Sequence, residues 1–157
     1  MDQYYPWFVL VHLLGLSLFL AGHGVAMFLS FRVRRARDRE RAAELLMLSG
    51  QGSQVSLLGL LVLVLGGLAA AWVGGLLLAP WVVASYVVLV VVYVLMSAIA
   101  SPYYYGLRNG LTGRRGAPPI EDGELLRRLD SRRPEALAVV GSIGLVVLLW
   151  LMVLKPG

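Results

Sequence analysis

Four long apolar segments restrict the fold of this chain more than any other feature of its sequence. They cover about residues 7–31, 55–77, 81–105 and 135–154, and each can cross a hydrocarbon core of about 30 Å. Lipid offers no hydrogen-bond partners to a backbone, so such segments form helices. The composition agrees, because only 15% of the 157 residues are charged and the mean hydropathy is +0.77. We therefore predict one all-α domain, a bundle of four transmembrane helices.

The basic residues predict how this bundle is oriented. Thirteen of the fourteen Lys and Arg residues fall in two stretches, about residues 32–54 and 106–134. Positively charged loops remain in the cytoplasm, so we expect two basic cytoplasmic loops with both termini outside. The tryptophans support this orientation, because all four lie toward the opposite boundary, where indole rings prefer to sit: Trp7, Trp72, Trp81 and Trp150.

The second basic stretch leads to three further expectations. Pro102 should kink or end the third span near the inner surface. The sequence GELLRRLDSRR, which begins at Gly123, is compatible with an amphipathic helix on the inner leaflet, and a solvated linker is the alternative. Arginines beside spans attract anionic headgroups, so we expect the partners of these loops to be lipids and not nucleic acid.

Glycines recur at intervals of seven along the first two spans. Such a stripe drifts by only about 20° per heptad, and small residues let helices approach closely in lipid. We therefore predict close helix packing, and assembly into a homo- or hetero-oligomer, through Gly15, Gly22, Gly52, Gly59 and Gly66. The alternative is that glycine leaves room for a flat macrocycle between the helices.

His12 and His23 are the only histidines and the candidate binding residues. His23 follows His12 by eleven positions, which places both on one face of a helix, about 16 Å apart. Ionisable groups in a span seldom face lipid, so both should look into the bundle. Depth counted from the tryptophans places Tyr86 level with His12. The same count places Ser56 and Ser97 level with His23. One hypothesis is therefore two neutral imidazoles, each hydrogen-bonded to these partners.

A cofactor is the other hypothesis for the two histidines. Their spacing resembles the ligand spacing of a four-helix bundle that holds two b-type haems. Two haems need four axial ligands, so Met47 or Met96, or a second subunit, would have to supply the others. Copper is a further alternative, because imidazole and thioether groups suit it, although the sequence shows no Met-x-x-Met or His–Met cluster.

The sequence offers no set of catalytic residues. It contains no cysteine, no paired carboxylates inside a span and no phosphate-binding glycine loop before a basic residue. We therefore predict no catalytic site, and our first hypothesis is an accessory or structural subunit of a membrane assembly. The alternatives are a haem-carrying redox subunit that uses His12 and His23, and a copper-related membrane protein.

Three stretches also carry a resemblance: LVHLLGLSLFLAGHGVAMFLSFRVRRARDRERAAELLMLS, LLVLVLGGLAAAW and SPYYYGLR. They resemble a poorly characterised family of small bacterial four-helix membrane proteins of unknown function, distantly similar to the membrane domain of copper-resistance protein D. The resemblance covers about the first two-thirds of the chain. It implies four helices and a histidine-based site. We expect a multi-pass location in the bacterial inner membrane. The methionine and further histidine ligands of a copper carrier are not matched.

Overall fold

The computed structural model describes residues 2–36, 38–112, 118 and 120–156, and every regular element in them is helical. A short 3-10 helix, η1 (Asp2–Tyr4), precedes four α-helices and a fifth, short one: α1 (Tyr5–Arg34), α2 (Arg39–Val73), α3 (Pro80–Thr112), α4 (Asp122–Leu129) and α5 (Arg133–Leu154). Four helical stretches are long and apolar enough to cross a membrane. The predicted all-α fold with four membrane-spanning helices is confirmed.

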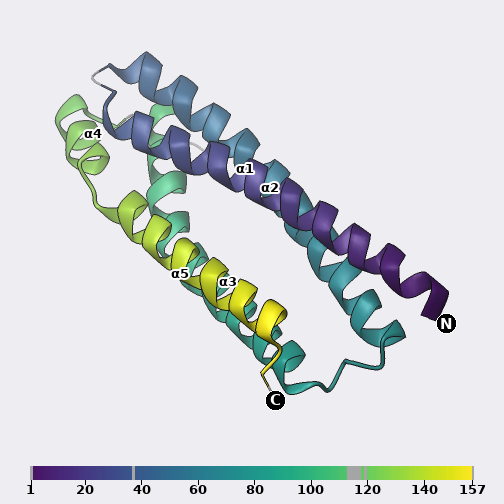
Figure 1. The fold of residues 1–157 in the computed structure, drawn as a ribbon. Coiled ribbons are helices and arrows are strands. Elements are labelled where there is room, and N and C mark those ends of the chain that lie inside the picture. Colours follow the sequence, from purple (N-terminus) through teal and green to yellow (C-terminus); the bar gives the residue numbers. More distant parts are fainter. Residues whose placement is uncertain (1, 37, 113–117, 119, 157) are drawn as a thin grey trace.

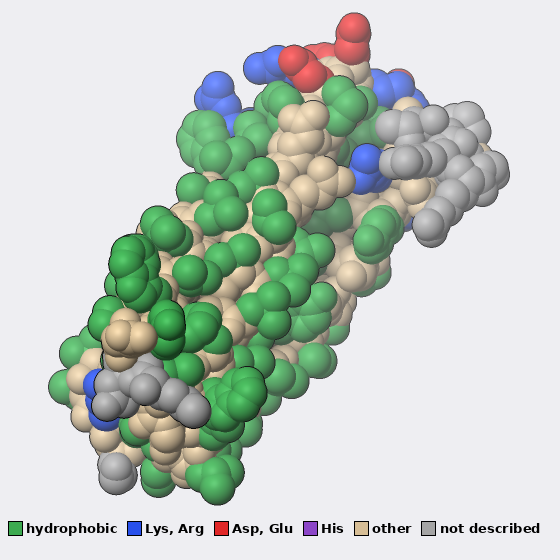
Figure 2. All heavy atoms as spheres, turned by 90° about the vertical axis from the view of Figure 1, so that its right-hand side faces the viewer, with side chains coloured by type: hydrophobic (Ala, Val, Ile, Leu, Met, Phe, Trp, Pro, Cys, Tyr) green, Lys and Arg blue, Asp and Glu red, His purple; other side chains and the backbone are tan. Residues whose placement is uncertain are grey.

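The four long helices form two antiparallel pairs, α1 with α2 and α3 with α5 (Figure 1). Both chain ends and the α2–α3 turn lie at one end of the bundle, which we call the terminal end. There the Lys155 ammonium lies 5.4 Å from the centroid of the Trp81 ring. The α1–α2 turn and α4 lie at the other end, which we call the basic end. Figure 2 shows hydrophobic side chains along the length of the molecule and acidic ones gathered at the basic end.

Glycine brings α1 and α2 into backbone contact. A Cβ atom on Gly59 would lie 2.7 Å from Phe19 Cα, and one on Gly15 would lie 2.7 Å from Leu63 Cα. Real Cβ atoms do not approach a backbone this closely, so no larger residue fits at either position. The structure places the other three glycines of the predicted stripe against the facing helix as well: Gly22, Gly52 and Gly66.

Ten buried residues form a cluster at the basic end, which we call the cap cluster. They come from α1, α2, α3, α4 and the segments beside these helices: Val33, Ala36, Ala42, Leu45, Leu46, Tyr103, Leu107, Ile120, Leu125 and Leu129. Burial of this apolar surface, at about 25 cal/mol per Å², stabilises helix segments that lie beyond the expected spans.

Two helices therefore extend further than expected. α2 begins at Arg39, within the expected loop 32–54, because the Asp38 carboxylate accepts a hydrogen bond from the Arg41 backbone N–H at 2.7 Å and caps the first turn. α3 runs through Pro102 to Thr112, so the helix does not end at the proline, and a kink there stays a prediction. Leu107 lies beyond the proline and is fully buried in the cap cluster, which offsets the hydrogen bond that proline removes.

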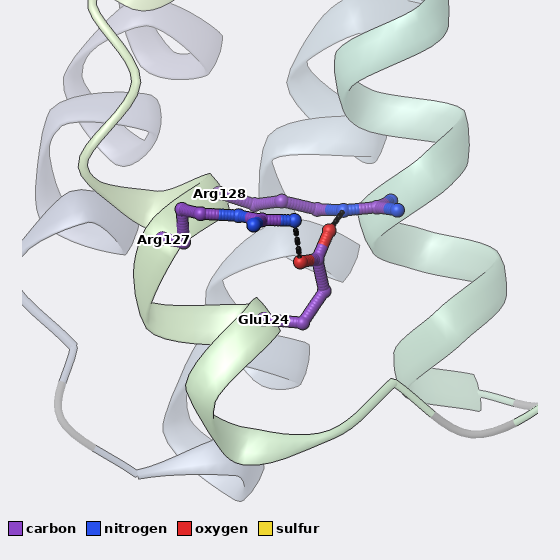
Figure 3. A network of polar contacts seen from close by, with 3 residues as sticks. All are labelled: Glu124, Arg127 and Arg128. Carbon is purple, nitrogen blue, oxygen red and sulfur yellow. Dashed lines mark hydrogen bonds and ion pairs between the residues drawn. The ribbon is translucent and has the colours of Figure 1, made fainter.

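The segment after α3 forms the short helix that was one of the two alternatives, but the helix packs elsewhere than expected. α4 is a helix and not a linker, and its Leu125 and Leu129 are buried in the cap cluster instead of facing the inner leaflet. Within α4 the Glu124 carboxylate accepts from Arg128 Nε at 2.7 Å and also pairs with Arg127 (Figure 3). The apolar face of this amphipathic helix thus packs against other parts of the protein.

Candidate functional site

Both histidines are partly buried on α1, at the boundary between the two helix pairs. We call this boundary the seam. Residues from all four long helices line it: His12 and His23 from α1, Gly67 from α2, Tyr86 and Met96 from α3, and Gly141 from α5.

The imidazole of His12 is held by the backbone carbonyl of Leu63, which lies 2.7 Å from Nδ1. A carbonyl only accepts, so Nδ1 carries a proton, and Nε2 makes no hydrogen bond to another described residue. This contact requires glycine at position 67. A Cβ atom on Gly67 would lie 2.7 Å from His12 Nδ1 and would overlap with the ring.

Tyr86, the expected partner of His12, lies close by but does not take the hydrogen bond. Its hydroxyl is 3.5 Å from the Cβ position of Gly67, so depth counting did bring Tyr86 and His12 to the same glycine. The bond goes to Leu63 because Gly67 has no side chain to cover the carbonyl one turn before it. That carbonyl can accept a second hydrogen bond through its other lone pair, which counting side chains overlooks.

His23 meets a thioether instead of the expected hydroxyl groups. The Cβ position of Gly141 lies 3.4 Å from His23 Nε2 and 3.6 Å from Met96 Sδ. The Phe19 ring stacks on the imidazole with the centroids 5.4 Å apart. Within the described part of the chain, the structure gives His23 no hydrogen bond. The expected bonds to Ser56 and Ser97 are therefore not formed.

The geometry around His23 also bears on the expected haem ligands. Met47 is 56% exposed and lies away from the seam. Gly22 contacts the α2 backbone, with its Cβ position 2.7 Å from Gly52 O, while the Cβ position of Gly24 has nothing within 4 Å. The space beside Gly22 is thus occupied by the facing helix, whereas the space beside Gly24 is open.

Polar contacts tie the seam together toward the basic end. The Tyr104 hydroxyl donates to Ser30 Oγ at 2.6 Å, which links α3 to α1. Arg34 of α1 and Glu135 of α5 form an ion pair at 2.5 Å. Neither link was foreseen, although Ser30 shares the helix face of the two histidines and so could have indicated the first one.

No three His, Cys, Asp or Glu side chains gather into a metal site among the residues that the structure describes. A cavity of about 570 Å³ lies between α3 and α4 at the basic end, beside Asn109 and Arg128, and neither histidine lines it. The pair of donor atoms from His23 and Met96 is therefore the candidate site that the geometry offers.

Comparison with known proteins places the chain in a family. A family model described as "Predicted integral membrane protein (DUF2269)" matches residues 7–156. No curated protein matches the chain, and no solved structure matches it. The family match agrees with the resemblance to an uncharacterised membrane-protein family, but it does not extend to copper-resistance protein D. Because the match spans nearly the whole sequence, this protein belongs to the DUF2269 family of integral membrane proteins.

Proposed function

We propose that this membrane protein binds a soft metal ion, of the cuprous class, between His23 and Met96. One observation carries the proposal: His23 Nε2 and Met96 Sδ lie 3.4 and 3.6 Å from the same point beside Gly141. The two donors come from different helix pairs, so the fold brings them together. Imidazole nitrogen suits copper, and thioether sulfur selects its cuprous form.

The charge of the surroundings supports a monovalent ion. Both donors are neutral, and no Asp or Glu occurs in residues 3–37 or 45–120, the stretches that contain them. Moving an ion out of water is costly unless charge is compensated, and this cost rises with the charge of the ion. His23 makes no hydrogen bond to another described residue, so its ring nitrogens are available to a ligand.

The geometry favours an ion over a haem. Haem iron also accepts histidine and methionine ligands, but a porphyrin needs a flat slot beside them. Gly22 is used for contact with α2, and the donors of His23 and Met96 approach the same small space beside Gly141. A single ion bound by a nitrogen and a sulfur atom needs no such slot.

The test is a titration of purified protein with Cu(I) under reducing conditions, in competition with a chromogenic chelator. We expect one ion per chain. Met96→Leu and His23→Leu should each weaken binding at least about tenfold, because loss of even an outer-shell partner costs 10–100-fold. Met47→Leu is the matched control, since this exposed methionine is remote from the seam. Unchanged affinity in Met96→Leu would contradict the proposed site.

An accessory or structural subunit without a cofactor is the second candidate function. It is favoured by His12, whose ring joins α1 to α2 through the Leu63 carbonyl, a contact of about 0.6 to 2 kcal/mol in membranes. Under this hypothesis the purified protein is colourless and binds no Cu(I). An absorption spectrum distinguishes a third outcome. A Soret band that is present in the wild type and absent in His23→Leu would show that His23 binds haem and not a metal ion.

We also propose that the terminal end faces the outside of the bacterial inner membrane. The arginine-rich basic end then faces the cytoplasm and its anionic headgroups, as positively charged loops do. The chain has no cysteine, so single cysteines report topology directly. Gln3→Cys and Lys155→Cys should react with an impermeant thiol reagent in intact cells, and Arg41→Cys should react only after lysis. Labelling of Arg41→Cys in intact cells would contradict the proposed orientation and indicate the opposite one.

A further inference from the structure

The seam is closed on the side of His23 that faces the basic end. The hydrogen bond between Tyr104 and Ser30 and the ion pair between Arg34 and Glu135 join the two helix pairs there. Beyond them lies the cap cluster, over which α4 packs. Arg39 at the start of α2 forms an exposed ion pair with Asp122 of α4 at 2.9 Å. These contacts join the two helix pairs between His23 and the basic end.

Toward the terminal end the two helix pairs move apart. Figure 1 shows α1 and α2 diverging from α3 and α5 between α4 and the labels of the chain ends. The backbone contacts made by the glycine stripe lie within the α1–α2 pair and do not cross the seam. In this half the seam is lined by His12 and Tyr86, which approach each other at Gly67.

Two polar atoms in this half lack partners. His12 Nε2 and the Tyr86 hydroxyl have no hydrogen bond to any residue that the structure describes, since His12 uses Nδ1 for Leu63. Hydrocarbon cannot satisfy such groups, and polar side chains within spans characteristically face water-filled cavities. We therefore expect the seam beside His12 to hold water or a polar ligand, and not only lipid tails.

We propose that the ion reaches His23 and Met96 along the seam from the terminal end, with His12 as its first ligand on the way. This inference rests on the proposed metal site. An imidazole whose Nδ1 donates to a backbone carbonyl and whose Nε2 is free has the arrangement of a metal-binding histidine. His12 and His23 share one face of α1, about 16 Å apart, so an ion that follows this face passes His12 before it meets His23.

The route can be tested without any metal. In the cysteine-free chain, Met96→Cys places a single thiol at the proposed site. In sealed vesicles of both orientations, with Lys155→Cys marking the terminal side, a small impermeant methanethiosulfonate should modify Met96→Cys from the terminal side only. Leu95→Cys is the matched control, because this neighbour is 48% exposed on the outer surface of the bundle and should react from neither side. Modification of Met96→Cys from the basic side, or from neither side, would overturn the route.

The role of His12 has a kinetic test. In His12→Leu, Cu(I) should load the His23–Met96 site about tenfold more slowly, while the equilibrium affinity of that site is unchanged. Gly67→Ala should slow loading too, because its Cβ atom would displace the His12 ring. Loading of His12→Leu at the wild-type rate would remove His12 from the route. If wild-type protein binds no Cu(I), the proposed function fails, and the thiol experiment still decides whether the seam opens to the terminal side.

Discussion

Gly59→Leu is expected to abolish the folded bundle. A Cβ atom at this position would lie 2.7 Å from Phe19 Cα and 2.8 Å from the carbonyl carbon of Leu18. Both atoms belong to the backbone, so no side-chain rotation can relieve the overlap, and leucine adds three more carbon atoms. Overpacking of a core costs about 1–3 kcal/mol and sometimes more; with backbone on the opposing side we expect about 3 kcal/mol or more. The measurement is the monodisperse fraction in size-exclusion chromatography, together with resistance to unfolding by a denaturing detergent.

Gly24→Leu is the matched control for this substitution. Gly24 lies on α1 and has nothing within 4 Å of its Cβ position. Leucine is the better helix former by up to about 1 kcal/mol, so this variant should fold as well as wild type. Gly15→Leu repeats the experiment from the other side of the interface and should match Gly59→Leu. If the protein tolerates leucine equally at Gly24 and Gly59, the close contact between α1 and α2 does not exist.

Gly22 and His23 are adjacent in the sequence because α1 contacts α2 on one face and the seam on another. Successive residues of a helix point about 100° apart, so one of the pair can face α2 while the next faces the seam. Gly22 contacts the α2 backbone at Gly52, and His23 reaches Met96 and Gly141. One short sequence thus serves two interfaces: the glycine determines how closely α2 approaches, and the histidine supplies the polar atom of the seam.

The number of spans was predictable from the sequence, but the ends of the helices were not. Apolar length alone determines a membrane-spanning helix, because lipid leaves the backbone no other partner. The early start of α2 depends on the Asp38 cap, and the passage of α3 through Pro102 depends on burial of Leu107 in the cap cluster. Burial of this kind arises from tertiary packing, which hydropathy along the chain does not contain.

The candidate site was predictable only in part, for a similar reason. Periodicity places His12 and His23 on one face, and depth counting brings Tyr86 near His12. Neither argument reveals a backbone acceptor such as the Leu63 carbonyl. The meeting of His23 with Met96 depends on the rotation of α3 and α5 against α1, and a sequence of apolar spans carries little information on that register.

The second large effect is expected at Leu129 of α4. Leu129 is 2% exposed and belongs to the cap cluster, whereas Leu126 of the same helix is 42% exposed. Truncation of a buried leucine to alanine costs about 2–5 kcal/mol, so Leu129→Ala should lower the free energy of unfolding by that amount in detergent solution. Leu126→Ala, which removes the same atoms from the exposed face, should change it by less than about 1 kcal/mol.

The comparison of these two variants also tests how the basic end is closed. If α4 lay on the lipid surface, detergent would solvate both leucines, and the two alanine variants would unfold with equal and small changes in free energy. That result would contradict the packing of α4 against the cap cluster. It would also open the end of the seam beyond Tyr104 and Arg34, and Met96→Cys should then become reactive from the basic side as well. Unequal effects at Leu129 and Leu126, together with modification of Met96→Cys from the terminal side alone, would establish a bundle closed at one end and accessible from the other.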